Sequence, residues 1–225
     1  MMTSFATLTI GQAPRSDIMP LLMAYLPAKS VTHVGLLDGL STEQIEQRYA
    51  PAEGDAVLVT RLLDGSQVSL AASRVERGLQ EKIDLLEELG CMTILLLCTG
   101  EFNHLHAKNA LLLEPDRIIP PLISSIIGLH RAGVVVPVES QVVEQANKWR
   151  KLAKAPCFAV ASPYISDDQA LTEAAMRLAE QGAEVVLLDC IGYNRHHAEV
   201  LKKHLNIPVL LSNVLMAKLA AELVV

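Results

Sequence analysis

The stretch Thr93-Ile94-Leu95-Leu96-Leu97-Cys98-Thr99-Gly100 is a continuous aliphatic run that ends in small residues. A run of this kind is typical of a strand that is buried on both faces of a parallel sheet. The preceding residues 73–89 carry apolar side chains at helical spacing, and Gly90 suits the position that ends a helix. A long helix followed by a buried strand is one unit of an α/β fold, and it places Cys98 at the carboxyl end of the strand.

A second stretch near the end of the chain follows the same plan. Residues 167–181 predict a helix, residues 185–188 predict a buried strand, and the strand leads into Asp189-Cys190-Ile191-Gly192. Cys98 and Cys190 lie 190 − 98 = 92 positions apart, and each is followed two residues later by glycine. This weak internal repeat predicts two halves of similar architecture.

The rest of the chain continues the alternation of strands and helices. We place Pro14 in the first turn of the first helix, and Pro120-Pro121 at the start of another. Asp64-Gly65-Ser66, between two strand-like runs, predicts a hairpin that interrupts the alternation. Further strands are predicted over residues 5–10, 31–37, 133–138, 158–161 and 209–211, and further helices over residues 17–25, 41–49, 120–130, 141–152, 194–204 and 213–223.

These elements predict an α/β fold of two Rossmann-like αβα lobes, each built on a parallel sheet. Ligands of open parallel sheets bind outside the carboxyl ends of the strands. If the two lobes face each other, Cys98 and Cys190 line one interlobe cleft, which is the predicted site.

The composition excludes several classes of protein. With 51% hydrophobic and 4% aromatic residues among 225, the chain can bury an aliphatic core. The net charge of −6, without a Lys/Arg cluster, argues against nucleic acid as a partner. The longest apolar run, residues 92–98, is far shorter than the roughly 18 residues that cross a bilayer, so we expect no membrane helix. The start of the chain lacks a signal-peptide pattern, which predicts a cytoplasmic protein with reduced thiols.

The sequence carries no motif for a cofactor or a metal. The four cysteines have no CxxC spacing, and the glycines form neither a GxGxxG pattern nor a Walker A loop. His104 and His106 have no further ligand at metal-binding spacing, so we expect no metal site. Cys91 and Cys157 stand where strands begin, and we assign them to packing.

Cys98 and Cys190 are the candidate catalytic residues. A thiolate is favoured at a helix N-terminus, and both cysteines precede segments expected to be helical. The alternative, that each is a small buried hydrophobic residue, stays open. Two thiols on opposite sides of one carbon suit racemisation without a cofactor: one removes an acidic proton beside a carboxylate, and the other returns a proton to the opposite face. His196 and His197 could relay protons, although a surface position is the simpler reading for both.

A bound carboxylate and its enolate need hydrogen-bond donors. Backbone N–H groups at helix starts, including the Gly100 region, could supply some of them. Glu139, just beyond a predicted strand, could be a carboxylate of the cleft, although a charge at a helix start is the simpler reading. Further candidate binding residues are Thr9, Gln12, Arg15, Thr99, Ser212 and Asn213, each of which also reads as an ordinary cap or loop residue.

Several motifs together resemble the AroM family along essentially the whole chain. They are Leu8-Thr9-Ile10-Gly11 with Pro14-Arg15, Arg74-Val75-Glu76-Arg77, Arg117-Ile118-Ile119-Pro120-Pro121-Leu122, Val136-Pro137-Val138-Glu139, Leu188-Asp189-Cys190 and Pro208-Val209-Leu210-Leu211-Ser212-Asn213-Val214. AroM proteins are similar, more distantly, to the Asp/Glu/hydantoin racemase superfamily, which includes maleate isomerases and arylmalonate decarboxylases. That resemblance implies two αβα lobes with one cysteine from each in the cleft, at the positions of Cys98 and Cys190.

The sequence departs from the racemase pattern around both cysteines. Cys98-Thr99-Gly100 stands where racemases have Cys-Asn-Thr, and Asp189-Cys190-Ile191 stands where they have Gly-Cys-Thr. Asp189 would oppose thiolate formation if its carboxylate faced Cys190.

The superfamily pattern implies a first lobe of residues 1–128 plus 212–225 and a second lobe of residues 129–211. We predict a cofactor-independent racemase or isomerase that acts on a small carboxylate through Cys98 and Cys190. One alternative is single-thiol chemistry, as in a decarboxylase or a cis-trans isomerase. Another is a small-molecule-binding protein without catalysis, which the departures around the cysteines favour. The oligomeric state stays open, with a homo-oligomer among the options.

Overall fold

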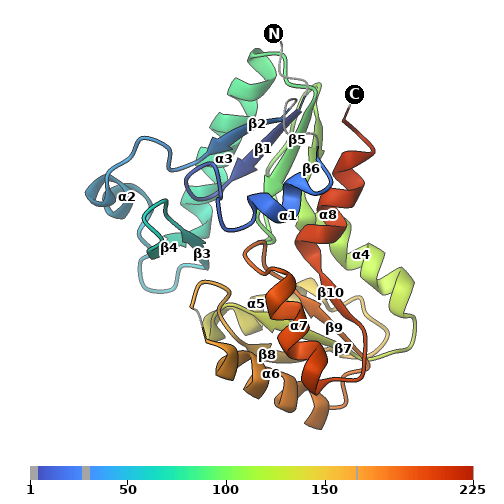
Figure 1. Cartoon of the computed structure of the whole chain (residues 1–225). Coiled ribbons are helices and arrows are strands. Elements are labelled where there is room, and N and C mark those ends of the chain that lie inside the picture. Colours follow the sequence, from blue (N-terminus) through green and yellow to red (C-terminus); the bar gives the residue numbers. More distant parts are fainter. Residues whose placement is uncertain (1–4, 27–30, 166, 225) are drawn as a thin grey trace. The chain divides into compact units, whose positions relative to one another are not determined.

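The computed structural model describes residues 5–26, 31–165 and 167–224, which form two compact units. Unit 1 contains residues 1–115 together with 216–225, and unit 2 contains residues 116–215. The predicted lobe boundaries, 128/129 and 211/212, stay a prediction. The units change over at 115/116, at the start of helix α4 (Pro115–Ile127), and at 215/216, inside helix α8 (Ser212–Ala221) (Figure 1).

Unit 1 contains a parallel sheet of four strands in the order β2-β1-β5-β6. The strands are β1 (Phe5–Thr9), β2 (Val31–Gly35), β5 (Thr93–Leu97) and β6 (Leu111–Leu113). Every residue of β1 and β5 is buried, as the aliphatic run in the sequence predicts for central strands. In the register of the sheet Thr9 pairs with Leu97, so the chain leaves β1 and β5 at the same edge.

The helices of unit 1 begin and end where local sequence signals predict. Helix α2 (Thr42–Tyr49) starts with a capping box between Ser41 and Gln44. Helix α3 (Ala72–Glu88) buries an apolar stripe against the sheet and is followed by Gly90 at φ 82°, a conformation that favours glycine. Helix α1 (Met19–Met23) is short and carries Pro20 in its first turn.

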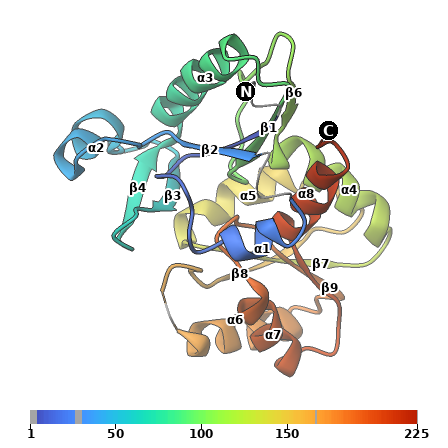
Figure 2. The ribbon, with the colours of Figure 1, turned by 45° about the horizontal axis from the view of Figure 1, so that its top comes forward.

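The predicted hairpin is present in unit 1. Strands β3 (Val57–Arg61) and β4 (Gln67–Ala71) pair antiparallel, outside the four-stranded sheet. The turn contains Gly65 at φ 89°, which a side chain would strain, and Leu62 N–H donates to Ser66 O. Figures 1 and 2 show the hairpin beside α2.

Unit 2 contains a second parallel sheet, in the order β10-β9-β7-β8. Helices α6 and α7 pack side by side (Figures 1 and 2). The strands are β7 (Ala132–Val136), β8 (Cys157–Val160), β9 (Val185–Leu188) and β10 (Val209–Leu211), and the remaining elements are α5 (Val142–Lys148), α6 (Asp168–Glu180), α7 (Arg195–His204) and the 3₁₀ turn η1 (Glu139–Gln141).

The two sheets have the same topology. In each unit the first strand lies between the second and the third, and the fourth lies beyond the third. The strand order therefore reverses between β1 and β5 in unit 1 and between β7 and β9 in unit 2. In open parallel sheets this switch point, at the carboxyl ends of the strands, is where ligands bind. The expected α/β fold with parallel sheets is confirmed.

Three local predictions were wrong. Pro14 lies in the loop before α1 and not in the helix. Helix α4 begins at Pro115, where a proline and then Asp116 suit a first turn, so Pro120 and Pro121 lie inside the helix. Cys98 precedes no helix: residues 98–110 are irregular and lead to β6, a three-residue strand too short for a periodic signal.

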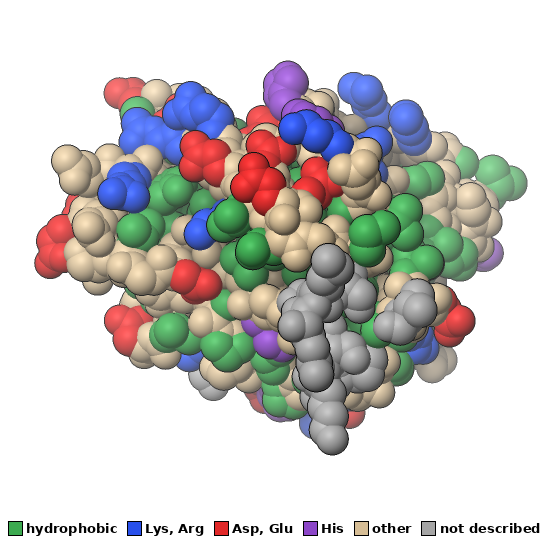
Figure 3. Space-filling view, turned by 90° about the horizontal axis from the view of Figure 1, so that it is seen from above, with side chains coloured by type: hydrophobic (Ala, Val, Ile, Leu, Met, Phe, Trp, Pro, Cys, Tyr) green, Lys and Arg blue, Asp and Glu red, His purple; other side chains and the backbone are tan. Residues whose placement is uncertain are grey.

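One face of the molecule carries side chains of both charges. On the face shown in Figure 3, acidic and basic side chains are interspersed among the described residues. No described helix has the length and apolar character needed to cross a membrane.

Candidate active site

The Cys98 thiol lies at the carboxyl end of β5, the third strand of its sheet. Its side chain is buried, at 7% exposure. Gly100 N–H donates to Cys98 Sγ at 3.4 Å. A backbone N–H aimed at sulfur is a donor that a thiolate could accept, and it stands where the sequence predicted a helix N-terminus.

Glycines let the hairpin approach Cys98 closely. A Cβ on Gly100 would lie 2.5 Å from Leu58 Cδ2 and 3.4 Å from Cys98 Sγ. A Cβ on Gly11 would lie 2.5 Å from Thr60 Oγ1 and 2.9 Å from Arg61 O. Strand β3 therefore packs against both loops that leave the switch point of unit 1.

The predicted binding residues of unit 1 gather on this edge, and most have structural partners. Thr9 Oγ1 accepts from Gly11 N–H, and Gln12 Oε1 accepts from Leu63 N–H at 2.9 Å. Arg15 is buried and donates from Nε and Nη2 to the two oxygens of Asp17, at 2.9 and 2.7 Å. Thr99 is also buried.

Cys190 occupies the equivalent place in unit 2, just beyond the third strand, β9. It is 8% exposed, and its Sγ lies 3.5 Å from the hydroxyl oxygen of Tyr164. A Cβ on Gly192 would lie 2.5 to 2.8 Å from atoms of the Tyr164 side chain. In both units the glycine two residues after the cysteine therefore has the same structural role. Its missing side chain leaves room for a side chain of another segment, Leu58 at Gly100 and Tyr164 at Gly192.

Asp189, which the sequence suggested could oppose a thiolate, is compensated by a buried cation. Lys148 Nζ lies 2.7 Å from Asp189 Oδ2 and 3.5 Å from Asp116 Oδ1. Ser212 Oγ donates to Asp189 Oδ1 at 3.0 Å. The Lys148 and Asp189 side chains are 3% and 0% exposed, so this charge balance is part of the interior of unit 2.

The turn that follows Cys190 is held by a buried network. Asn213 Nδ2 donates to the carbonyl oxygens of Ile191 and Tyr193. Tyr193 Oη donates to Ala161 O at 2.6 Å, and burial, with Cys190 nearby, raises the pKa of Tyr193 well above its usual range. Ser212 and Asn213, both predicted as binding residues, therefore fix Asp189 and the Cys190 turn from the start of α8.

The two adjacent histidines differ in exposure. His196 is exposed and pairs with Asp168, with 2.7 Å between Nε2 and Oδ1. His197 is buried, contrary to the surface position expected, and its Nδ1 accepts from Asn194 N–H at 2.9 Å. His197 is thus a capping residue of α7.

The remaining side chains singled out in the sequence are an exposed carboxylate and two buried thiols. Glu139 is exposed at the start of η1. Cys91 and Cys157 are buried, and their thiols donate to Thr93 O and Ala132 O. Among the described residues, no group of three or more His, Cys, Asp or Glu side chains could hold a metal ion.

Sequence reasoning missed Tyr164 and Lys148 near Cys190 and Arg61 in the hairpin. Tyr164 follows β8 within four residues, so its place near the carboxyl edge was readable from the strand pattern. Lys148 is the last residue of a helix, where the sequence alone predicts a solvated charge. Its contact with Asp189 depends on the tertiary fold.

Comparisons with known proteins agree with this architecture. A family profile described as AroM protein matches residues 5–224. The structure is similar to an aspartate racemase of Picrophilus torridus, at 14% identity and a TM-score of 0.55, over 97% of this chain and 94% of the racemase. It is also similar to an allantoin racemase of Pseudomonas fluorescens (16%, TM-score 0.57, 97% and 88%) and to a glutamate racemase of Bacillus anthracis (13%, TM-score 0.63, 98% and 81%). Identities this low show the fold alone. A search of curated protein sequences found no match.

Proposed function

Since the chain belongs to the AroM family and has a racemase-like fold, we propose that it is a cofactor-independent racemase or isomerase of a small carboxylate. In this proposal Cys98 and Cys190 are the acid and base, and each unit supplies one thiol to a single bound substrate.

One observation carries the proposal: the two cysteines occupy equivalent positions. Each follows the third strand of a sheet with the same strand order, at the switch point, and is followed two residues later by a close-packed glycine. Cys91 and Cys157 lie at the opposite ends of their strands, where the thiols donate to backbone carbonyls. The chain thus separates two cysteines at ligand-binding edges from two in packing positions.

The chemistry needs only proton transfers. A thiolate takes the proton from the carbon beside the carboxylate, so that the C–H bond breaks, an S–H bond forms and the electron pair moves into the enolate. The second thiol gives its proton to the opposite face of that carbon and becomes the thiolate. Reaction in the reverse direction exchanges the two roles.

The local contacts support a charged sulfur at each position. Gly100 N–H is aimed at Cys98 Sγ, and the Tyr164 hydroxyl can donate to Cys190 Sγ. The Asp189 carboxylate is occupied by Lys148 and Ser212, so its negative charge is balanced beside Cys190. Thr9, Gln12, Arg15, Thr99, Gly100, Glu139, Ser212 and Asn213 stay candidates for binding or positioning the substrate.

The test is exchange of the α-proton of chiral amino and hydroxy acids in deuterium oxide, followed by proton NMR. Cys98→Ser and Cys190→Ser should each lower exchange about 10²- to 10⁴-fold, the usual contribution of a general acid or base. Cys91→Ser and Cys157→Ser are the matched controls and should retain it. Exchange that is unaffected by both Cys98→Ser and Cys190→Ser would refute the proposal.

The unequal surroundings of the two sulfurs favour a second candidate, single-thiol chemistry. Cys98 has a backbone donor, whereas Cys190 faces a phenol that can donate or accept. Exchange that survives Cys190→Ser but not Cys98→Ser would select this candidate. Thermal stabilisation by an acid without any exchange would select the non-catalytic binding protein. The cytoplasmic location and a homo-oligomeric state stay predictions.

A further inference from the structure

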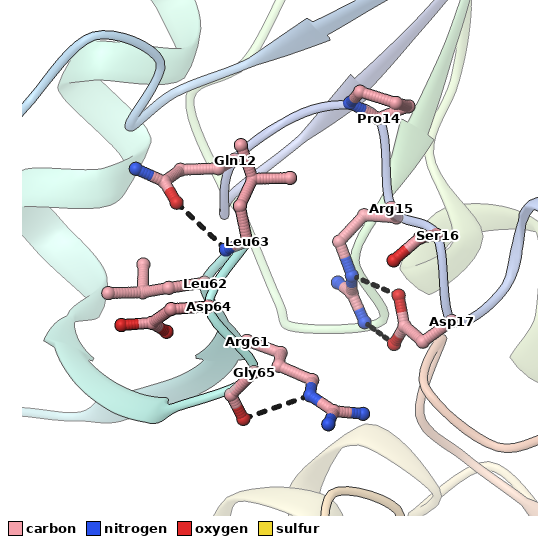
Figure 4. Close-up of a pocket in the computed structure, with 10 residues that line it drawn as sticks. All are labelled: Gln12, Pro14, Arg15, Ser16, Asp17, Arg61, Leu62, Leu63, Asp64 and Gly65. Carbon is pink, nitrogen blue, oxygen red and sulfur yellow. Dashed lines mark hydrogen bonds and ion pairs between the residues drawn. The ribbon is translucent and has the colours of Figure 1, made fainter.

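A polar pocket of about 280 Å³ is lined by residues of unit 1. Two segments form it: the loop that follows β1, residues 12–17, and the hairpin turn, residues 61–65. Figure 4 shows Arg15 and Asp17 on one side and Arg61 on the other, with the Arg61 guanidinium extending into the space between them. The volume is close to the lower end of the range for small-molecule sites, so it suits a small ligand.

Two arginines and two aspartates line the pocket, so its formal charges sum to zero, but they are not all paired with one another. Asp17 accepts hydrogen bonds from Nε and Nη2 of Arg15, so these two opposite charges pair with each other. Asp64 Oδ1 accepts from the backbone N–H and the hydroxyl of Ser66, and its carboxylate points away from Arg61 in Figure 4. Within the described residues Arg61 makes a single hydrogen bond, from Nε to Gly65 O at 3.0 Å, and no ion pair. Among the described residues Arg61 is therefore the cation of the pocket without an ion pair, and Asp64, which accepts only from Ser66, is the anion without one.

The hairpin holds Arg61 in a fixed place. Gln12 Oε1 accepts from Leu63 N–H, which ties the turn to the loop after β1. Gly11 allows Thr60 and the Arg61 carbonyl to approach that loop within van der Waals distance. An arginine on a tied strand loses little conformational freedom when it binds, which favours recognition of a ligand.

Strand β3 connects the pocket with the surroundings of Cys98. Leu58 of β3 lies against Gly100, two residues beyond Cys98, and Arg61 ends the same strand. Because Thr9 pairs with Leu97, the loop that lines the pocket and the loop that bears Cys98 leave the sheet at one edge. A ligand in the pocket therefore lies at the carboxyl edge of the sheet that carries the thiol.

We propose that this pocket binds an anionic group, a carboxylate or a phosphate, through the guanidinium of Arg61. A planar guanidinium binds such oxyanions with two parallel hydrogen bonds, which a single ammonium cannot do. The inference rests on the proposed function in one respect: it assigns the bound group to the substrate, which then carries a second negative group besides the carboxylate at the reacting carbon.

The test is calorimetric titration of the Cys98→Ser/Cys190→Ser protein with succinate, propionate and inorganic phosphate. Catalysis is absent from this variant, so binding is measured alone. Succinate or phosphate should bind at least tenfold more tightly than propionate, and Arg61→Gln should abolish that preference. Arg61→Lys should retain part of it. Arg48→Gln, which removes an exposed arginine of the same unit, should leave it unchanged.

The stronger binding of succinate or of phosphate identifies the group as carboxylate or phosphate. Failure of all three probes to bind, or equal binding to the parent and to the Arg61→Gln variant, would overturn the assignment of the pocket. Arg61-dependent binding together with a complete lack of exchange in the cysteine-containing protein would overturn the proposed function and leave the anion pocket standing.

Discussion

At the scale of single residues, a buried lysine, Lys148, pairs with the carboxylate that directly precedes Cys190. Lys148 lies between Asp189 and Asp116, and Asp189 is the residue directly before Cys190. A buried ion pair adds little net stability when it is intact, but removal of one partner leaves a charge without compensation. Lys148 therefore compensates a buried negative charge on the residue that directly precedes Cys190.

We predict that Lys148→Met lowers the free energy of unfolding by about 3–5 kcal/mol, the usual cost of breaking a buried pair. It should also slow alkylation of Cys190, because the buried charge of Asp189, the preceding residue, is then uncompensated and opposes the thiolate. The double variant Lys148→Met/Asp189→Asn removes the closer ion pair, although Asp116 still loses its contact with Lys148, and should recover part of the stability and most of the alkylation rate. Urea denaturation and mass spectrometry of alkylated peptides measure the two quantities.

A double variant as unstable and as slowly alkylated as Lys148→Met alone would contradict this account. Alkylation of Cys98, in the other unit, is the internal control and should not change.

The two cysteines could be predicted from the sequence because their positions follow from local pattern. An aliphatic run predicts a buried strand, and the residue after it stands at the carboxyl edge. The contacts around Cys190 could not be predicted in this way. Tyr164 lies 26 positions from Cys190, and Lys148 lies 41 positions from Asp189. Contacts over such separations depend on strand order, which periodicity does not specify.

At the scale of elements, the start of α7 is a cap whose strength depends on pH. Asn194 Oδ1 accepts from His197 N–H, and His197 Nδ1 accepts from Asn194 N–H. The second bond requires Nδ1 to be unprotonated. Burial lowers the pKa of His197 from 6.5, the neighbouring His196 lowers it further, and Asp168 partly opposes the shift.

This cap predicts a loss of stability on the acid side. Above pH 6.5 the imidazole is neutral in both the folded and the unfolded chain and contributes no pH dependence. Below pH 6.5 the unfolded chain binds a proton that the folded chain resists, so stability falls with pH until the lowered pKa of the folded state is passed. Melting temperature should therefore decrease between pH 7.5 and pH 5.5.

His197→Gln should flatten that decrease, because glutamine fills the same position of a capping box and does not titrate. His196→Gln is the matched control, since His196 is exposed, and should change the slope less. If melting temperature depends on pH equally in the His197→Gln variant and the parent, this cap does not cause the loss of stability in acid.

Elements with a local chemical cause were predicted, and elements without one were not. The capping box of α2, the hairpin turn and the glycine after α3 each depend on residues within a few positions. Helix α4 was placed five residues late, since Pro120-Pro121 is a stronger local signal than Pro115 although the helix tolerates it. The repeat predicts a helix after Cys98, as after Cys190, whereas the segment after Cys98 crosses to β6 without regular structure.

At the scale of the whole molecule, a repeated topology places one thiol in each unit. The sequence repeat of a helix, a buried strand and Cys-x-Gly predicts two halves of similar architecture. The two sheets have matching strand orders, which agrees with that prediction. The points where the chain passes between units lie at the start of α4 and inside α8, and no change in composition marks them.

If both units serve one substrate, a single ligand should protect both functional thiols. We predict that an acid that binds, added at saturation, slows alkylation of Cys98 and of Cys190 together, with one ligand bound per chain. Burial raises the pKa of Cys91 and of Cys157, so these thiols should react slowly with or without ligand and serve as controls. Quantitative mass spectrometry of the four cysteine peptides gives all four rates in one experiment. Protection confined to one of the two cysteines would mean that each unit binds on its own, and a mechanism with two thiols on one carbon would then fail.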